Sequence, residues 1–164
     1  MAGTLPIRHN VVRKLKKKRD EMKFKSRKDN LFKFFVLGLS GLFIAIILIQ
    51  IPLQREIFEF ILTSIIMVMT IGLLFWLYFG TEYELSETEL KYKSGPIRGK
   101  VKIEEITEIV KAKTHWSGLK PATARNGLIV KYRKMEEVYI SPETNETFIN
   151  KILEINEKIK ITEI

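Results

Sequence analysis

The sequence predicts an α+β membrane protein in which two transmembrane α-helices precede a strand-rich domain with a C-terminal capping helix. Two long runs without a charged residue predict the helices, and they lie in the first half of the chain. Short segments that alternate apolar and polar residues predict the strands, and they fill most of the second half. The expected boundaries are 1–33 for a basic cytoplasmic arm, 34–81 for a transmembrane hairpin and 82–164 for the domain.

The arm carries most of the positive charge of the chain. Residues 1–33 hold twelve Lys or Arg and three acidic residues, which matches the formal net charge of +9 for the whole chain. A nucleic-acid-binding domain would normally carry its positive charge on the folded unit, where the charge can follow a groove. The sequence therefore predicts no nucleic-acid partner, and it assigns the arm to an anionic membrane surface.

Six residues in the densest part of the arm are predicted to contact anionic lipid headgroups. Near an anionic leaflet each Lys or Arg contributes about 1 kcal/mol. A helix lying on the membrane surface and a disordered arm both fit the pattern, because the apolar stripe that runs from Val11 to Met22 is thin. The six residues are Arg13, Lys14, Lys16, Lys17, Lys18 and Arg19.

The two apolar runs predict transmembrane helices at 34–54 and 57–80. The uncharged runs are 34–54 and 60–81, each of at least 21 residues, and at about 1.5 Å per residue this length reaches across the hydrocarbon core of a bilayer. A cleaved signal peptide does not fit the first run, because its basic region would exceed thirty residues. Gly38, Gly41 and Ala45 have a spacing that allows close helix packing, although small residues also occur in apolar helices without that role.

The charges that flank the helices predict the orientation. Twelve Lys or Arg precede the first helix, whereas the loop between the helices holds only Arg55. Because short cytoplasmic loops are enriched in Lys and Arg, both termini are expected in the cytoplasm of a multi-pass cell-membrane protein. Trp76 and Tyr78 near the end of the second helix fit the aromatic belt of a membrane interface.

The remainder of the chain predicts a small barrel or sandwich of antiparallel strands. Alternation of apolar and polar residues indicates half-buried strands, and turn residues such as Ser94-Gly95-Pro96 separate them. The six expected strands are 83–86, 90–94, 100–103, 106–114, 127–133 and 137–141.

A helix is predicted after the last strand. Ser141 is a good cap, Pro142 fits the first helical position, and Glu143 favours the positive end of the helix dipole. Apolar residues from Phe148 to Ile159 recur at the helical period, so one face of this helix should pack on the end of the strand domain.

A series of short motifs follows in order through this region: Tyr83 leading the first strand, Ser94-Gly95, Ile103 with Glu105-Ile106, Pro121-Ala122, Ile129 with Tyr132, and Ile140-Ser141-Pro142 before Phe148. Their order and spacing resemble the bacterial pleckstrin-homology (PH) domains of the YyaB-like family, over roughly Thr81 to Glu157. The resemblance implies two orthogonal sheets with a helix at one end. PH domains that bind phosphoinositides place Lys and Arg in the loop after the first strand, whereas the matching loop here, Ser86 to Glu89, is acidic.

The sequence offers no catalytic, cofactor or metal site. Its two histidines, His9 and His115, are far apart, and it contains no cysteine. Both aspartates, Asp20 and Asp29, lie in the arm. Metal sites and nucleophilic triads need several such residues together, so an enzyme is not expected.

The expected function is therefore that of an interaction or scaffold module with an unknown protein partner, and self-association is compatible with it. A contact patch on the loop between the fourth and fifth strands would comprise Trp116, Leu119, Lys120 and Arg125, since aromatic residues and Arg favour interfaces. Alternatively, this loop packs over the strands. The alternative function is immunity against a peptide bacteriocin, which raised tolerance of a sensitive host would reveal.

Overall fold

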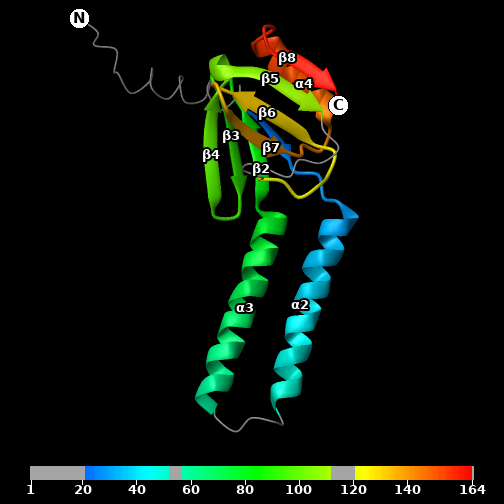
Figure 1. Ribbon diagram of the computed structural model, residues 1–164, viewed down its shortest axis with the longest axis vertical. Coiled ribbons are helices and arrows are strands. Elements are labelled where there is room, and N and C mark those ends of the chain that lie inside the picture. Colours follow the sequence, from blue (N-terminus) through cyan, green and yellow to red (C-terminus); the bar gives the residue numbers. More distant parts are fainter. Residues whose placement is uncertain (1–20, 52–56, 112–120, 164) are drawn as a thin grey trace, which may run out of the picture.

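Two long antiparallel helices carry a sheet-rich domain at one end (Figure 1). The structure is a computed structural model that describes residues 21–51, 57–111 and 121–163. Helix α2 (Asn30–Gln50) leads away from the domain, and α3 (Ile57–Phe79) leads back to it. The N-terminal and C-terminal parts of the described chain therefore meet at the same end of the helix pair.

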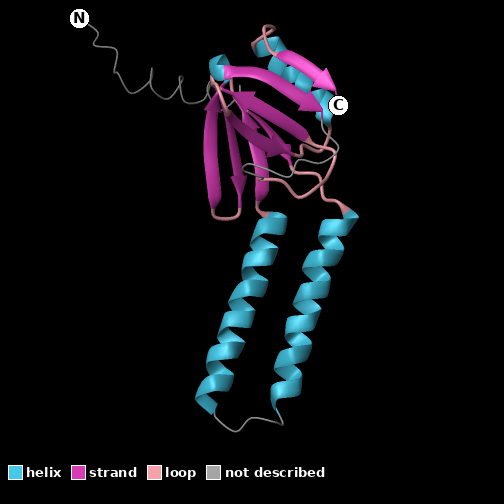
Figure 2. Cartoon of the chain, viewed as in Figure 1, coloured by secondary structure: helices cyan, strands magenta, loops and turns pink. Residues whose placement is uncertain are grey.

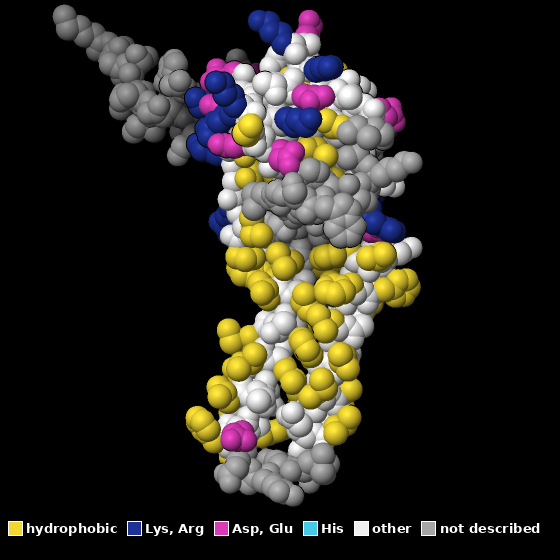
Figure 3. All heavy atoms as spheres, viewed as in Figure 1, with side chains coloured by type: hydrophobic (Ala, Val, Ile, Leu, Met, Phe, Trp, Pro, Cys, Tyr) yellow, Lys and Arg dark blue, Asp and Glu magenta, His cyan; other side chains and the backbone are white. Residues whose placement is uncertain are grey.

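The surface of the helix pair is apolar. Phe34 is 72% exposed and Phe58 is 76% exposed, and large apolar side chains cover most of both helices (Figure 3). Soluble monomers seldom expose contiguous apolar patches of this extent. Both helices are long and apolar enough to cross a membrane, as the sequence predicts. Helix α2 starts four residues before the expected position because the Asp29 side chain caps it by accepting a hydrogen bond from the Leu31 amide (3.4 Å).

The two helices meet through one face of α2. Val36 is only 1% exposed, and Ser40 is also buried there. A Cβ atom added to Gly38 or Gly41 would meet no other atom within 4 Å. Of the two alternatives for these glycines, the structure favours small residues without a packing role, because neither glycine lies at the contact between the two helices.

The domain consists of two four-stranded sheets (Figure 2). The first has the order β1-β2-β3-β4, with all neighbours antiparallel. The second has the order β7-β6-β5-β8, in which only β8 is parallel to its neighbour. The bounds in the first sheet are Met22–Lys25, Thr81–Leu85, Glu89–Ser94 and Ile97–Lys102. For β5 to β8 they are Ile106–Lys111, Leu128–Tyr132, Glu136–Ile140 and Lys160–Glu163.

The core lies between the two sheets and is closed at one end by helix α4 (Asn145–Ile155). Leu85 and Leu90 from the first sheet, and Leu128 and Val130 from the second, are completely buried. Phe148 of α4 is completely buried in the same cluster. The six predicted strands and the capping helix are therefore confirmed. The described strands form two separate sheets and not a closed barrel, so the sandwich is the correct form of the prediction.

The start of α4 differs from the prediction. Thr144 is the N-cap residue, and the helix begins at Asn145. Ser141 is instead completely buried, and its hydroxyl takes part in hydrogen bonds inside the domain. Pro142 forms a β-bridge with Ser26. These two residues therefore join the sheets and do not start the helix. Ser and Pro are also common at the start of a helix, which is why the sequence favours that position for them.

Strand β1 lies within the segment that was expected to be a basic arm. Met22 and Phe24 point into the domain, and the ring of Phe24 meets the ring of Phe148 edge-on at a centroid distance of 5.2 Å. The chain from residue 22 therefore belongs to the domain, and the boundary expected at Lys33 does not match the structure. The predicted headgroup contacts between Arg13 and Arg19 lie outside the described residues.

Candidate functional site

The outer face of the first sheet carries almost only charged side chains. Alternate residues of a strand point to opposite faces, and in all four strands the residues opposite the core are Lys, Arg or Glu. Three are acidic: Glu82, Glu84 and Glu89. Seven are basic: Lys23, Lys25, Lys91, Lys93, Arg98, Lys100 and Lys102. We call these ten residues the charged face.

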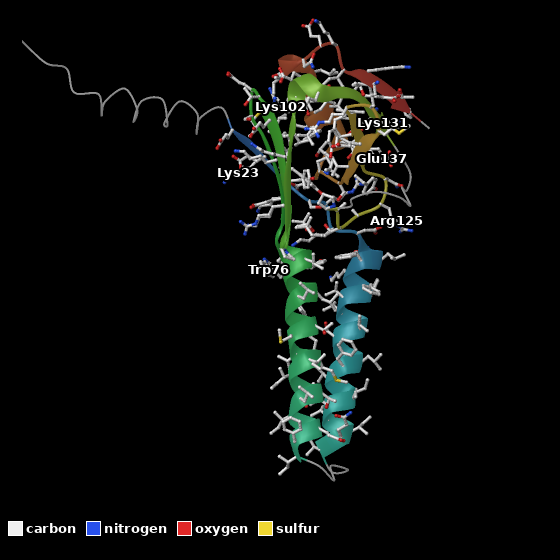
Figure 4. The ribbon with its side chains drawn as sticks, turned by 60° about the vertical axis from the view of Figure 1, so that its left-hand side comes forward. Lys23, Trp76, Lys102, Arg125, Lys131 and Glu137 are labelled. Carbon is white, nitrogen blue, oxygen red and sulfur yellow. The ribbon has the colours of Figure 1, made fainter. Side chains whose placement is uncertain are left out.

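Figure 4 shows how the charged face is turned. Lys23 and Lys102 lie on the outer side of the first sheet, and Lys131 and Glu137 lie on the other side of the domain, with the second sheet. The strands of the first sheet run roughly along the direction of the helices (Figures 1 and 4). The charged face therefore looks sideways from the helix axis.

Ion pairs neutralise only part of this face. Lys93 Nζ lies 3.3 Å from Glu82, and Lys100 Nζ lies 3.0 Å from Glu89. These pairs are exposed, and such pairs contribute little to stability. Among the described residues, Lys23, Lys25 and Arg98 form no ion pair. The face therefore keeps unneutralised positive charge that an acidic partner could contact.

A shallow depression of about 440 Å³ lies on the charged face. Its rim includes Lys23, Lys91, Lys93, Arg98 and Lys100, one or more from each of three strands. Two carboxylates, those of Glu82 and Glu84, also line it. The depression thus presents several cations around a small area, with carboxyl groups between them.

One carboxyl pair on this face has unusual electrostatics. A hydrogen bond that the protonated Glu84 carboxyl donates to Glu21 is the largest cause that raises the pKa of Glu84 above its ordinary value of 4.5. Lys91 Nζ lies 3.6 Å from Glu21 and 3.7 Å from Glu84, and its charge acts in the opposite direction. A shared proton between two carboxyls accounts for the raised value, because two ionised carboxylates repel each other at hydrogen-bond distance.

The helix pair is joined to the first sheet almost without a linker. Only Gly80 separates α3 from β2. A Cβ atom at Gly80 would lie 2.6 Å from the Trp76 carbonyl oxygen, so only glycine fits this turn. The Thr81 hydroxyl donates to the Leu77 carbonyl of α3 (2.7 Å) and bonds the Ser94 hydroxyl of β3 (2.9 Å). The end of α3 is therefore held to two strands.

A second junction ties the start of α2 to the domain. The Ser26 hydroxyl lies 2.9 Å from the hydroxyls of Thr123 and Ser141 and 3.1 Å from that of Tyr83, and all four residues are buried. The Tyr83 hydroxyl donates to the Pro121 carbonyl (2.6 Å). Burial is the largest cause that raises the pKa of Tyr83, so this hydroxyl remains protonated. The cluster joins β1, β2, β7 and the segment before β6.

Arg125 reinforces the same junction. Its Nε lies 2.7 Å from the Asp29 carboxylate, and this hydrogen bond is the largest cause that lowers the pKa of Asp29. Arg125 was predicted as part of a contact loop, and the structure places it at the start of α2. The other members of that loop, Trp116, Leu119 and Lys120, lie outside the described residues. Ala122, from the same segment, packs on Val110, Ile129 and Tyr139.

The turn between β2 and β3 lies at the far end of the domain from the helices. Strand β2 starts at the end of α3, and five residues at about 3.4 Å each carry the chain roughly 17 Å away. The Ser86 hydroxyl accepts from the Glu89 amide (3.0 Å) and so closes this acidic turn. This turn, which matches the phosphoinositide-binding loop in the resemblance to PH domains, therefore points away from the helix pair.

The charged face does not show in the net charge of the sequence, because residues 81–164 are nearly neutral. The signal lies in the spacing of the cations. Three segments alternate apolar or small residues with cations: 22–25, 90–93 and 97–102. Placing these segments side by side would have gathered their cations on one face.

Comparison with known proteins identifies the domain. Residues 81–156 match the family described as "Bacterial PH domain". Over 98 residues the chain is 32% identical to "Uncharacterized protein YyaB" of Bacillus subtilis (strain 168), a match that covers 59% of this chain and 67% of that protein. No solved structure matches significantly. The resemblance that the motifs indicated is thereby confirmed.

Proposed function

The chain belongs to the bacterial PH domain family, and from this premise we propose that it is a membrane-anchored interaction module. The helix pair would cross a bacterial cell membrane, and the PH-like domain would hold the charged face at its cytoplasmic side. The function is that of a scaffold that recruits an acidic partner, and it involves no catalysis. The observation that carries this proposal is a cationic sheet face fixed to apolar helices by two junctions.

The proposed orientation has support from both sequence and structure. Eleven Lys or Arg precede α2, and Lys33 lies in its first turn; Lys and Arg favour the cytoplasmic side. Strand β1 precedes α2 and pairs with β2, which follows α3. This pairing requires both flanks of the helix pair to lie on one side of a membrane, and by the same rule we expect the whole domain in the cytoplasm.

The chemistry of the charged face favours an acidic protein segment as the partner. Its cations are interrupted by Glu82, Glu84 and Glu89, which would repel the closely spaced phosphates of a nucleic acid. A protein surface can instead place carboxylates opposite the cations and avoid the glutamates. Complementary charges of this kind increase the association rate and select among partners.

Site-specific crosslinking tests the proposal. A photoreactive amino acid would replace Arg98 on the charged face, or Thr107 of β5 as the control on the second sheet, in the full-length protein in native membranes. We expect a discrete protein adduct from position 98 that is lost on Lys23→Glu and Lys91→Glu substitution. Equal adducts from both positions, or adducts that survive charge reversal, would contradict it. A nucleic-acid adduct would show that the partner class is wrong.

A further inference from the structure

A pocket of about 220 Å³ lies between the domain-side ends of α2 and α3. Two lysines, Lys28 and Lys33, line it together with apolar and aromatic residues of both helices. The latter are Val36, Leu37, Phe75, Tyr78 and Phe79. The pocket is separate from the charged face, with which it shares no lining residue.

The cationic part of the pocket is not neutralised by a carboxylate. The ammonium of Lys28 lies over two aromatic rings, 4.4 Å from the centre of Phe79 and 4.7 Å from that of Tyr78. Neither Lys28 nor Lys33 forms an ion pair within the described part of the chain. The nearby Asp29 carboxylate is already bound by Arg125 (2.7 Å). Two cations are therefore available to an anion at this position.

The position of the pocket along the helices determines which anion could reach it. Lys33 is the last charged residue before the apolar stretch of α2. Trp76, which points outward at the end of α3 (Figure 4), and Tyr78 are residues that favour the membrane interface. In a bilayer, the two lysines would thus lie at the level of the lipid phosphates, and Val36 and Leu37 would lie at the level of the first acyl carbons.

We propose that this pocket binds an anionic phospholipid. Lys28 and Lys33 hold the headgroup phosphate, and the first part of one acyl chain packs on Leu37 and Phe79. Basic pockets between transmembrane helices are known to suit anionic headgroups. The proposal rests on the proposed membrane insertion, but it adds a site with a defined shape. It also differs from the predicted contacts of residues 13–19, which involve no shaped pocket and should not discriminate among anionic lipids.

Native mass spectrometry of the full-length protein in detergent tests this site, with phosphatidylglycerol and phosphatidylcholine as probes. We expect bound phosphatidylglycerol to be retained under activation that removes phosphatidylcholine. The double variant Lys28→Gln/Lys33→Gln should reduce this preference on the order of tenfold, since each of the two cations contributes to the binding of the headgroup phosphate. Leu37→Trp, at a half-exposed position, should also weaken retention by filling the apolar part while both lysines remain.

The matched control is Lys23→Gln/Lys25→Gln, which removes two charges from β1 and should leave retention unchanged. Equal loss in the control would overturn the site, because general charge would then explain binding. Equal retention of both lipids by the parent protein would overturn it as well. Displacement by glycerol 3-phosphate would show a free-phosphate site and also contradict the proposal.

Alkaline extraction of membranes separates this inference from the proposed function. A protein that stays in the membrane pellet but shows no lipid preference would overturn only the phospholipid site. A protein released into the soluble fraction would overturn the membrane anchor and, with it, the site.

Discussion

At the scale of single residues, Phe148 links helix α4 to the domain core. It is completely buried, it belongs to α4, and it contacts Phe24 of β1. Phe148→Ala is expected to lower the free energy of unfolding by about 3–5 kcal/mol, because it leaves a cavity between two elements that are distant in sequence. Denaturant unfolding of the full-length protein in detergent measures this loss.

Met135→Ala is the matched control for this substitution. Met135 is 97% exposed in the turn between β6 and β7, so its truncation should leave the unfolding midpoint unchanged. A midpoint for Phe148→Ala equal to that of the control would show that α4 does not close the core.

Glu84 provides a pH-dependent prediction at the same scale. Its raised pKa means that the contact with Glu21 stabilises the fold at low pH, and that this contribution is lost as the pH rises through the raised value. Glu84→Gln supplies a donor that does not titrate. We expect the variant to be more stable than the parent by less than about 1 kcal/mol at about pH 7, because the site is partly exposed.

The stability gain from Glu84→Gln should diminish towards about pH 4, where the parent carboxyl also carries its proton. Denaturant unfolding at both pH values compares the two proteins, and Lys91 retains Glu21 as its ion-pair partner in the variant. A gain that does not change with pH would contradict the shared proton.

At the scale of elements, β1 shows where the sequence was informative and where it was not. Met22 and Phe24 alternate with two lysines, as a half-buried strand requires, but the surrounding run of charge indicated an arm. Whether an edge segment forms a strand depends on the strand that it pairs with. The partner of β1 is β2, which follows both helices in the sequence. Long-range pairing of this kind leaves little local signal.

The other elements also divide into those that a local sequence pattern predicts and those that it does not. The apolar runs of α2 and α3 and the alternation in β2 to β7 are local patterns, and they predicted the fold. The sequence does not indicate strand β8, because Ile159 continues the helical spacing of Phe148, Ile152 and Ile155, whereas the chain leaves the helix after Ile155. The buried hydroxyls around Ser26 belong to four separate segments, so no local motif could indicate that they meet.

Truncation tests the assignment of β1. Removal of residues 1–20 should leave the melting temperature of the domain unchanged, because the first strand remains. Removal of residues 1–26 should abolish its cooperative melt, because it exposes Leu85 and Phe148 and removes the Ser26 hydroxyl from its buried partners. Thermal melts in detergent distinguish these outcomes, and equal melts for the two truncations would show that β1 is dispensable.

At the scale of the whole molecule, the pairing of β1 with β2 makes a prediction about topology. The chain has no cysteine, so single cysteines can be introduced and labelled with a membrane-impermeant maleimide. Arg55→Cys, in the loop between the helices, should react in intact cells. Met135→Cys and Lys102→Cys should react only after permeabilisation. Labelling of Met135→Cys in intact cells would exclude the cytoplasmic orientation.

The one-residue connection at Gly80 has a consequence for how partners arrive. Because β2 continues from α3 almost directly, the domain is held to the helix end, and in the proposed membrane orientation its charged face would look along the bilayer and not towards it. A partner confined to the same membrane would then approach by lateral diffusion in two dimensions. In that geometry the number of complexes would follow the density of both proteins in the membrane area, and a soluble acidic competitor would have to match this local enrichment to displace the partner.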